Sequence, residues 1–329
     1  MPLQAECAHC AAPAPCVTCS NCKLVSFCSD AHQAAHKSVH NAACKRVEAK
    51  RKQLQKEHRK LKKVDDYEDI FEECEGYFYL EYETRPYMDA KHAYIDALVK
   101  IGSLKATQVA LEQAAEALRL NEQDDLHIKD FVPSLMLQLD QVQEAYDFIR
   151  YWATYNENEE ENEEDEDMDD GSPQLPPCMK PLNADVTDHL MCLPRLHTSI
   201  RRFSTLTYIK VVTSFGLNGA IKTSEGTDEN TKEAVAKFLE SKQIPTSVEE
   251  LKPLKEQVEA QAKAAFVLAH ERNNHLWKAL LNPKSLKNSS GYGDGMPEEV
   301  SHHVTSYSQL WKSTPYALDF LKQEIATIL

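Results

Sequence analysis

Glycine is scarce in this sequence, with nine residues in a chain of 329. Helix-favouring residues (Ala, Leu, Glu, Lys and Gln) are abundant instead, and apolar residues make up 42% of the chain. No stretch is long and apolar enough to span a membrane. The composition therefore predicts a mainly α-helical protein with an ordinary core and no membrane segment.

Familiar catalytic motifs are also missing. The sequence has no P-loop, no dinucleotide-binding fingerprint, no GxSxG and no HExxH. The adjacent His302 and His303 cannot share one helical face, and the isolated Cys74, Cys178 and Cys192 are expected to be buried or idle thiols. We therefore expect no enzymatic activity, no catalytic residue and no residue that binds an organic cofactor.

Cysteine and histidine, in contrast, are concentrated in the first 44 residues. Eight of them form four closely spaced pairs: Cys7-x2-Cys10, Cys19-x2-Cys22, Cys28-x3-His32 and His40-x3-Cys44. Each interval lets two side chains bind one tetrahedral metal, so eight ligands make two complete zinc sites. A site with four protein ligands has no open position for water or substrate, which predicts structural zinc.

Disulfides are the alternative explanation for clustered cysteines. Residues 1–12 lack the basic start and apolar run of a secretory signal, and histidine at regular intervals does not fit a disulfide framework. The segment also has few large apolar residues, mainly Leu24, Val25, Phe27 and Val39, so it needs bound metal to stay folded. We therefore expect an intracellular zinc protein, nuclear or cytoplasmic or both.

The end of this segment has the spacing of a helix. Ser29 is a suitable N-cap, and His32, His36, His40 and Cys44 follow at intervals of four, along one helical face. In such a helix His32 and His40 stand about 12 Å apart, so one metal cannot bind both. Two interleaved sites result, the first from Cys7, Cys10, Cys28 and His32 and the second from Cys19, Cys22, His40 and Cys44.

The whole pattern, including Cys19-Ser-Asn-Cys22, Phe27-Cys28-Ser29 and His32-Gln33, resembles a MYND-type zinc finger. That family interleaves its ligands in this way and is known mainly for binding proteins, so the resemblance implies a protein-interaction module. The family usually has an aromatic residue at position 37, where this chain has Lys37, so part of the usual peptide-contacting surface differs.

Two residues of the segment are left over. Cys16 forms its own CxxC pair with Cys19, but the interval from Cys22 to Cys28 matches the family and favours the Cys19–Cys22 pair. We interpret His36 as an exposed polar residue between the two metal sites.

Charge is distributed unevenly along the chain. The net charge is −15, yet residues 1–64 carry twelve Lys or Arg and four acids. The basic run from Lys45 to Lys63 can be a solvated helix, a nuclear import signal or a nucleic-acid contact. It lacks interleaved aromatic residues, so we favour the solvated helix and do not expect nucleic-acid binding. The acidic remainder is expected to attract basic protein partners, such as histone tails or ribosomal segments.

Helical patterns follow the basic run. Pro86 opens one helix, Gly102 closes it, and a second helix extends from Leu104 to Leu120. The turns at Val99–Gly102 and Leu137–Asp140 look alike and lie 38 residues apart, as in a tetratricopeptide repeat, although a plain helical bundle accounts for them almost as well. Two stretches resemble uncharacterised fungal MYND-containing helical proteins, which implies a fold and no function: Asp130–Leu137 and Tyr146–Trp152.

An acidic tract then interrupts the helices. Residues 157–170 hold eleven acids and no basic residue, which predicts disorder. The following Pro173-Gln-Leu175-Pro-Pro177 has the form Pro-x-Leu-x-Pro, which some MYND fingers bind. It is either a chance match or a tethered ligand for the finger.

Beyond the tract, three further helical stretches are predicted. Residues 200–220 place Phe203, Leu206, Ile209, Val212 and Phe215 at intervals of three, which we interpret as a buried face. Residues 248–281 form one helix or a pair broken near Pro253, and residues 297–329 supply the last helices.

The sequence thus predicts a zinc-binding adaptor with a mainly α fold and a two-zinc, cross-braced finger. One alternative is a nucleic-acid-associated transcriptional regulator that uses the basic run from Lys45 to Lys63. The enzymatic alternative is a relative of the SET-MYND lysine methyltransferases. That family has a glycine-rich segment before the finger and an Asn-His-Ser-Cys signature, whereas here Asn274-His275 is followed by Leu276-Trp277. The predicted regions are a finger at 1–46, a basic helix or linker at 47–64, a tetratricopeptide-like region at 65–155, an acidic loop at 156–177 and a second helical region at 178–329.

Overall fold

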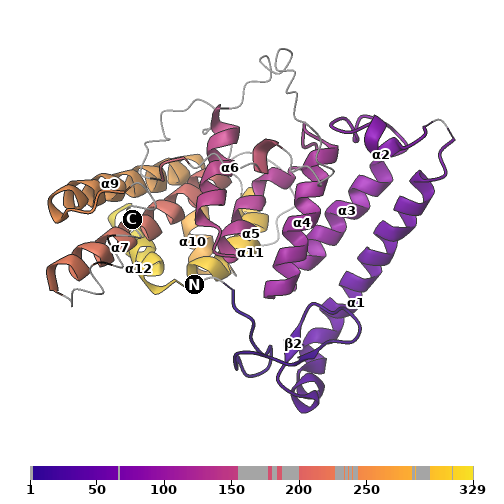
Figure 1. Ribbon diagram of the computed structural model, residues 1–329, viewed down its shortest axis with the longest axis horizontal. Coiled ribbons are helices and arrows are strands. Elements are labelled where there is room, and N and C mark those ends of the chain that lie inside the picture. Colours follow the sequence, from indigo (N-terminus) through magenta and orange to yellow (C-terminus); the bar gives the residue numbers. More distant parts are fainter. Residues whose placement is uncertain are drawn as a thin grey trace. The chain divides into compact units, whose positions relative to one another are not determined.

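The structure is a computed structural model of the chain (Figure 1). It describes residues 3–65, 67–154, 177–179, 184–186, 200–226, 244–283, 297–312 and 314–328, with single positions 233, 236, 239 and 286. Helices dominate, which confirms the predicted mainly α class. The chain divides into two compact units, residues 1–145 with 156–181 and residues 146–155 with 182–329.

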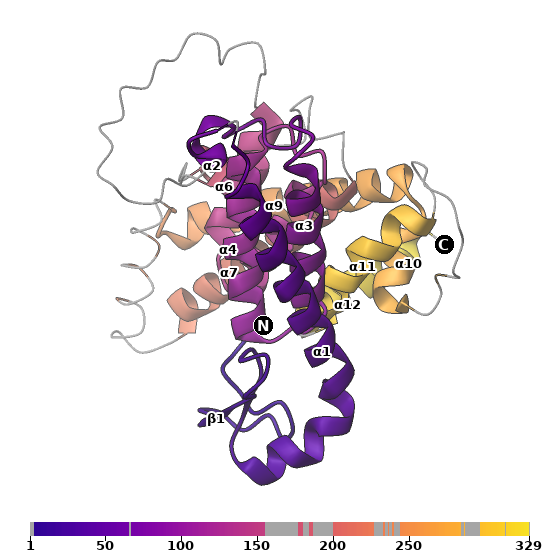
Figure 2. The same cartoon turned by 90° about the vertical axis from the view of Figure 1, so that its right-hand side faces the viewer.

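The first unit begins with the finger. Strands β1 (Val17–Thr18) and β2 (Ser26–Phe27) pair antiparallel, with Val17 opposite Phe27. Helix α1 (Asp30–Leu61) follows and extends well beyond the finger (Figure 2). Ser29 is its N-cap, and the Ser29 side chain accepts a hydrogen bond from the backbone N–H of His32, as predicted.

The rest of the first unit is built from short and medium helices. Helices α2 (Ile70–Glu73), α3 (Arg85–Val99) and α4 (Leu104–Leu120) precede a 3-10 turn, η1 (Ile128–Asp130). Helix α5 (Val132–Gln138) comes next, and α6 (Val142–Thr154) begins in this unit and ends in the second. Helix α3 packs against both α1 and α4. Four alanines of α4 are almost fully buried, which allows close helix contact: Ala106, Ala110, Ala114 and Ala117.

The basic stretch of α1 is not solvated on all sides. Val47 and Leu61 are buried in this helix, which packs against α3, while Lys45, Lys52 and Lys63 are exposed. The predicted solvated helix therefore describes only the outer face of α1.

The two similar turns share one backbone conformation. Gly102 has φ +66° and Asp140 has φ +65°, so both residues occupy the left-handed region. The helices that lead into these turns differ, however, since α3 has 15 residues and α5 has seven. The tetratricopeptide-like organisation stays a prediction.

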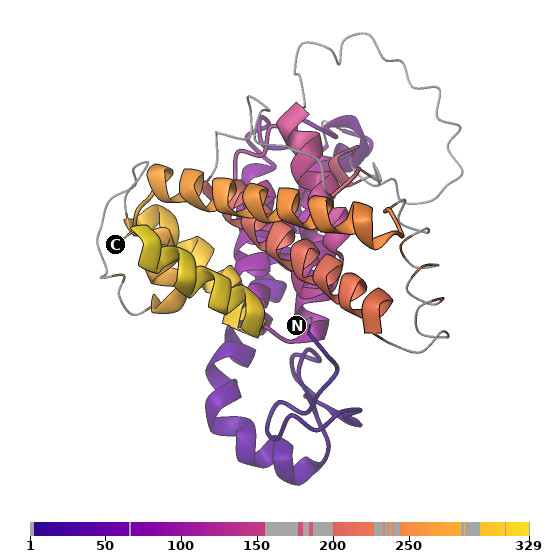
Figure 3. The ribbon, with the colours of Figure 1, turned by 90° about the vertical axis from the view of Figure 1, so that its left-hand side faces the viewer.

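The second unit is a helical assembly around aromatic residues. Besides the end of α6, its described helices are α7 (Ile200–Gly226), α9 (Val248–Arg272), α10 (Leu276–Leu281), α11 (Pro297–Lys312) and α12 (Pro315–Ile328). Helices α7 and α9 pack against each other along much of their length (Figure 3). Trp277 stacks on Phe266, meets Trp311 edge-on and donates from its indole N–H to the Phe266 carbonyl at 3.0 Å.

The predicted break near Pro253 is wrong. Helix α9 continues through Pro253, which lies near its start and removes only one backbone donor. The break falls after Arg272, where Asn273 leaves the helical conformation and its side chain accepts from the His275 N–H at 3.1 Å.

The predicted buried face of α7 is only partly correct. Leu206 and Ile209 are buried, but Val212 is half-buried and Phe215 is 50% exposed. Residues three apart are rotated by about 300° on a helix of 3.6 residues per turn, so a run of threes drifts off the buried face. Phe215 therefore lies at the surface.

Several predictions concern residues outside the described part of the chain. These include the disorder of the acidic tract at 157–170, Cys192, and all of the Pro-x-Leu-x-Pro stretch except Pro177. Among the helices that the structure does describe, none combines the length and the apolar character that crossing a bilayer requires.

Candidate metal centre

Two tight turns place the first two ligand pairs. After Cys7 and Cys10 the chain bends at Ala11, whose N–H donates to the Cys7 carbonyl at 2.7 Å. After Cys19 and Cys22 it bends at Lys23, whose N–H donates to the Cys19 carbonyl at 2.9 Å. Ala11 and Lys23 both have φ +57°, an uncommon conformation for residues other than glycine. The two turns thus present each Cys pair in the same way.

The first cluster joins the Cys7 turn to the start of α1. Its four ligand atoms lie within 4.8 Å of one another. The Nδ1 atom of His32 is 3.6 Å from the Cys7 sulfur and 2.9 Å from the Cys28 sulfur, and the sulfurs of Cys10 and Cys28 are 3.8 Å apart.

The second cluster joins the Cys19 turn to the next part of α1. Its ligand atoms also lie within 4.8 Å of one another. The Cys19 and Cys44 sulfurs are 3.8 Å apart, and the Cys22 sulfur is 3.3 Å from Nε2 of His40. The two histidines therefore present different ring nitrogens to their clusters.

Apart from the shorter distance between Cys28 and His32, these distances fit tetrahedral zinc. With Zn–S near 2.3 Å and Zn–N near 2.0 Å, the edges of a tetrahedron are about 3.8 Å between sulfurs and about 3.5 Å between sulfur and nitrogen. Each cluster supplies three sulfurs and one nitrogen, a soft donor set that suits zinc, and all four positions are filled by protein. The finger thus has two structural zinc sites, as the sequence predicts.

The surroundings of the ligands change their acidity. Burial opposes ionisation of the Cys7 thiol, but backbone hydrogen bonds from Cys28, His9 and Cys10 outweigh it and lower the pKa of Cys7 to about 5. Burial and the neighbouring Cys19 and Cys44 raise the pKa of Cys22 to about 12.

These opposite shifts have one consequence. A divalent cation outweighs the repulsion between neighbouring thiolates. Zinc binding must therefore release the proton of a thiol with a raised pKa, such as Cys22. The imidazole of His40 is ready to bind, because burial and the charge of His36 lower its pKa and keep the ring neutral.

The two leftover residues lie beside the clusters and outside them. The Cys16 thiol is exposed and donates to the Cys28 carbonyl at 3.4 Å. His36 is half-buried, with ring centroids of Phe27 at 5.7 Å and His40 at 6.3 Å, so its predicted exposure is only partly correct. A further neighbour that the sequence analysis missed is Asn21, whose amide donates to the Cys44 sulfur at 3.0 Å. Such a contact orients the ligand and tunes its charge.

The finger is fastened to the helices of the first unit. The Ser103 hydroxyl, at the α3–α4 turn, donates to the Leu24 carbonyl at 2.6 Å, and the Leu3 N–H donates to the Gln138 carbonyl at 2.8 Å. A groove of about 720 Å³ lies where the finger meets the α3–α4 turn. Val39 of α1 lines this groove and is 73% exposed, although the sequence offers it as one of the few apolar residues of the finger.

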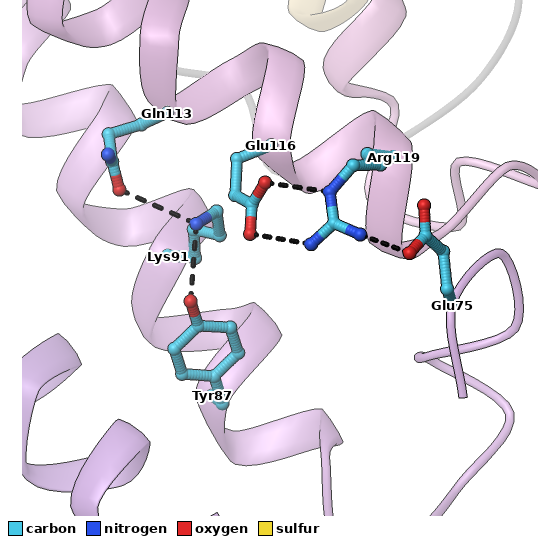
Figure 4. Close-up of polar contacts among 6 residues, drawn as sticks. All are labelled: Glu75, Tyr87, Lys91, Gln113, Glu116 and Arg119. Carbon is cyan, nitrogen blue, oxygen red and sulfur yellow. Dashed lines mark hydrogen bonds and ion pairs between the residues drawn. The ribbon is translucent and has the colours of Figure 1, made fainter. Parts of the chain in front are cut away.

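A polar cluster surrounds the buried amine of Lys91 in the first unit (Figure 4). Lys91 is 2% exposed, and its amine donates to the Tyr87 hydroxyl at 3.2 Å and to Gln113 at 3.5 Å. Close by, Arg119 forms ion pairs with Glu116 and Glu75. Burial lowers the pKa of Lys91 to about 8. With so little exposed surface, Lys91 contributes to the packing of α3 on α4 rather than to a binding surface.

Comparison with known proteins identifies the finger. Residues 7–44 match the family model of the MYND finger, a range that begins and ends at the outermost zinc ligands. No curated protein and no solved structure matches the chain. The finger is therefore a MYND finger with two zinc sites, whereas the resemblance of the remaining residues to fungal MYND-containing proteins stays a prediction.

Proposed function

We propose that this protein is an intracellular, non-catalytic adaptor in which zinc maintains a surface for binding other proteins. The observation that carries the proposal is the closed coordination of both metal clusters. Since each cluster has three sulfurs and one nitrogen from the protein, zinc has no position left for a substrate. The MYND finger is itself a protein-interaction module, which supports a scaffolding or regulatory role.

The groove between the finger and the α3–α4 turn is the surface that we assign to the partner. Its apolar part includes Val39 and Leu104. Its basic part includes three exposed lysines, Lys23, Lys100 and Lys105. An exposed apolar side chain between lysines favours a peptide with an apolar residue next to carboxylates.

The chain itself contains a peptide of this chemistry. Residues 157–170 hold eleven acids, and Pro173-Gln-Leu175-Pro-Pro177 follows with an apolar leucine between prolines. A tethered segment has a high effective concentration, so this stretch would mask the groove from other partners or link two copies of the protein. Deleting residues 171–177 and titrating a labelled Pro-x-Leu-x-Pro peptide tests this refinement. An affinity equal to that of the full chain would eliminate it.

The adaptor proposal is tested by proximity labelling in cells with Val39→Asp. A carboxylate at this position repels acidic peptides and disrupts the apolar contact. Asn41→Asp is the matched control, because Asn41 is exposed on α1, does not line the groove and gains the same charge. We expect the wild type and Asn41→Asp to label the same proteins, and Val39→Asp to lose a defined subset of them. Identical sets for all three proteins would contradict the proposal.

A further inference from the structure

A second hollow lies within the second unit and is lined by residues of α7, α9 and α12. Its volume is about 330 Å³, which is enough for one large side chain. The wall combines aromatic rings, carboxylates and lysines. This mixture of residues differs from the core of the unit, which is built largely from apolar side chains.

The aromatic part of the wall is a stacked pair. The rings of Phe215 and Tyr316 are nearly parallel, with an interplanar angle of 5° and centroids 3.8 Å apart. Phe215 is 50% exposed, so half of a large apolar side chain stays in contact with water. An aromatic face left open in this way is a suitable support for a flat cation.

The acidic part of the wall holds two carboxylates in different situations. Glu259 is well paired, since it accepts from the Ser214 hydroxyl at 3.1 Å and lies 2.8 Å from the Lys255 amine. The Glu324 side chain is only 10% exposed, yet its ion pair with Lys263 spans 3.7 Å. That distance is too long for a hydrogen bond, and Lys263 is itself 56% exposed.

A carboxylate that is nine-tenths buried and loosely paired is unfavourable unless a cation compensates it. Glu324 lines the pocket, so a cation that enters the pocket can reach it. The buried carboxylate of Glu324 and the exposed ring of Phe215 line the same pocket, so one ligand can satisfy both.

We propose that this pocket binds the side chain of an arginine in a basic protein segment, an inference that rests on the proposed adaptor function. The planar guanidinium stacks on the open face of Phe215 and donates two parallel hydrogen bonds to Glu324. Lysine is a poorer ligand, because its compact ammonium group matches neither the ring face nor the two carboxylate oxygens. Lys263 acts as a weak internal competitor that the arginine displaces from Glu324.

The test uses the full, zinc-loaded chain and the acetylated, amidated peptide Gly-Gly-Arg-Gly-Gly, titrated by saturation-transfer NMR. The matched peptide with citrulline in place of arginine keeps the planar shape of the side chain and removes its charge. A lysine peptide keeps the positive charge and lacks the planar guanidinium group. We expect saturable binding of the arginine peptide, weaker binding of the lysine peptide and none of the citrulline peptide.

Variants assign the binding to the pocket. Glu324→Gln is nearly isosteric and should weaken binding of the arginine peptide by about tenfold. Phe215→Ala should weaken it to a similar degree, whereas Lys263→Met should strengthen it, because the competing amine is gone. Glu271→Gln removes one exposed carboxylate of α9 away from the pocket and should change nothing. Equal affinity for the arginine and citrulline peptides, or an unchanged affinity in Glu324→Gln, would overturn the proposal.

The result is separable from the test of the adaptor function. If Val39→Asp labels the same cellular proteins as the wild type while the pocket still distinguishes arginine from citrulline, the adaptor proposal fails and the pocket stands. If Val39→Asp loses partners and the arginine peptide does not bind, the pocket fails and the adaptor proposal stands.

Discussion

Cys16 and Cys28 are close neighbours, yet only Cys28 belongs to a metal cluster. The thiol of Cys16 points to the Cys28 carbonyl, while the Cys28 sulfur lies 2.9 Å from Nδ1 of His32. In the sequence alone, the CxxC pair of Cys16 and Cys19 competes with the pair of Cys19 and Cys22. The structure selects the pair of Cys19 and Cys22, because the turn at Lys23 brings the Cys22 sulfur to 3.3 Å from Nε2 of His40.

This difference gives a matched pair of variants. Cys28→Ser removes one ligand of the first cluster, so we expect the bound zinc to fall from two ions per chain to one. Cys16→Ser removes a thiol outside both clusters and should leave two ions. Elemental analysis of the purified, reduced proteins measures both. A loss of zinc in Cys16→Ser would show that Cys16 is a zinc ligand.

Lys91 gives a prediction about stability and pH. Its pKa is lowered by burial from 10.5 to about 8. Between these two values the unfolded chain binds more protons than the folded one, so the free energy of unfolding rises with pH through this window. Below pH 8 the folded protein bears the full cost of the buried charge, which is about 3 kcal/mol.

The variant Lys91→Met removes that cost and keeps the apolar stem. We expect the free energy of unfolding of the first unit to increase by about 1–3 kcal/mol at pH 7, and its rise between pH 8 and pH 10 to flatten. Lys105→Met is the control, because Lys105 is exposed on α4 and should leave both quantities unchanged. Denaturant unfolding at several pH values measures them. A destabilised Lys91→Met would mean that its amine stabilises the fold through Tyr87 and Gln113.

At the scale of elements, helix limits were predictable where one residue enforces them. Pro86 lies in the first turn of α3, and Gly102 ends the following turn with a left-handed φ, both as predicted. The limit inferred from a single proline was wrong, since α9 continues through Pro253. Helix α1 runs from Asp30 to Leu61, so the metal-binding helix and the basic helix that leads out of the finger are one element.

Long-range packing had no signal in the sequence. Ser103 and Leu24 are 79 residues apart, and nothing in either residue indicates that a hydroxyl and a carbonyl will meet. The burial of Lys91 was equally unpredictable from the sequence, because a lysine on a helix is normally exposed to solvent. The zinc clusters were predictable because metal geometry limits the spacing of ligands far more strictly than packing limits apolar residues.

Zinc removal should separate the parts of the first unit. The finger has a small apolar core, chiefly Leu24, Val25 and Phe27, so a strong chelator should unfold residues 3–44. The later part of α1 should persist, because Val47 and Leu61 are buried and α1 packs against α3. Hydrogen exchange measures both segments. Protection of the finger that survives chelation would show that the metal does not maintain its fold.

On the scale of the whole molecule, the two candidate partner surfaces have opposite chemistry. The groove beside the finger is lined by Lys23, Lys100 and Lys105, whereas the pocket of the second unit is lined by the exposed ring of Phe215 and the buried carboxylate of Glu324. The net charge of −15 conceals this contrast. An adaptor with such surfaces can take an acidic segment on one unit and an arginine-bearing segment on the other.

The metal content of the reduced 329-residue chain is the most direct test of the two zinc sites. Native mass spectrometry at neutral pH should show the mass of the polypeptide plus two zinc ions, with protons lost from the thiols that bind them. Acidification should release both ions, because protons compete for the same sulfur and nitrogen atoms. A chain that carries one zinc ion or none, or a mass that indicates disulfides between these cysteines, would contradict the account.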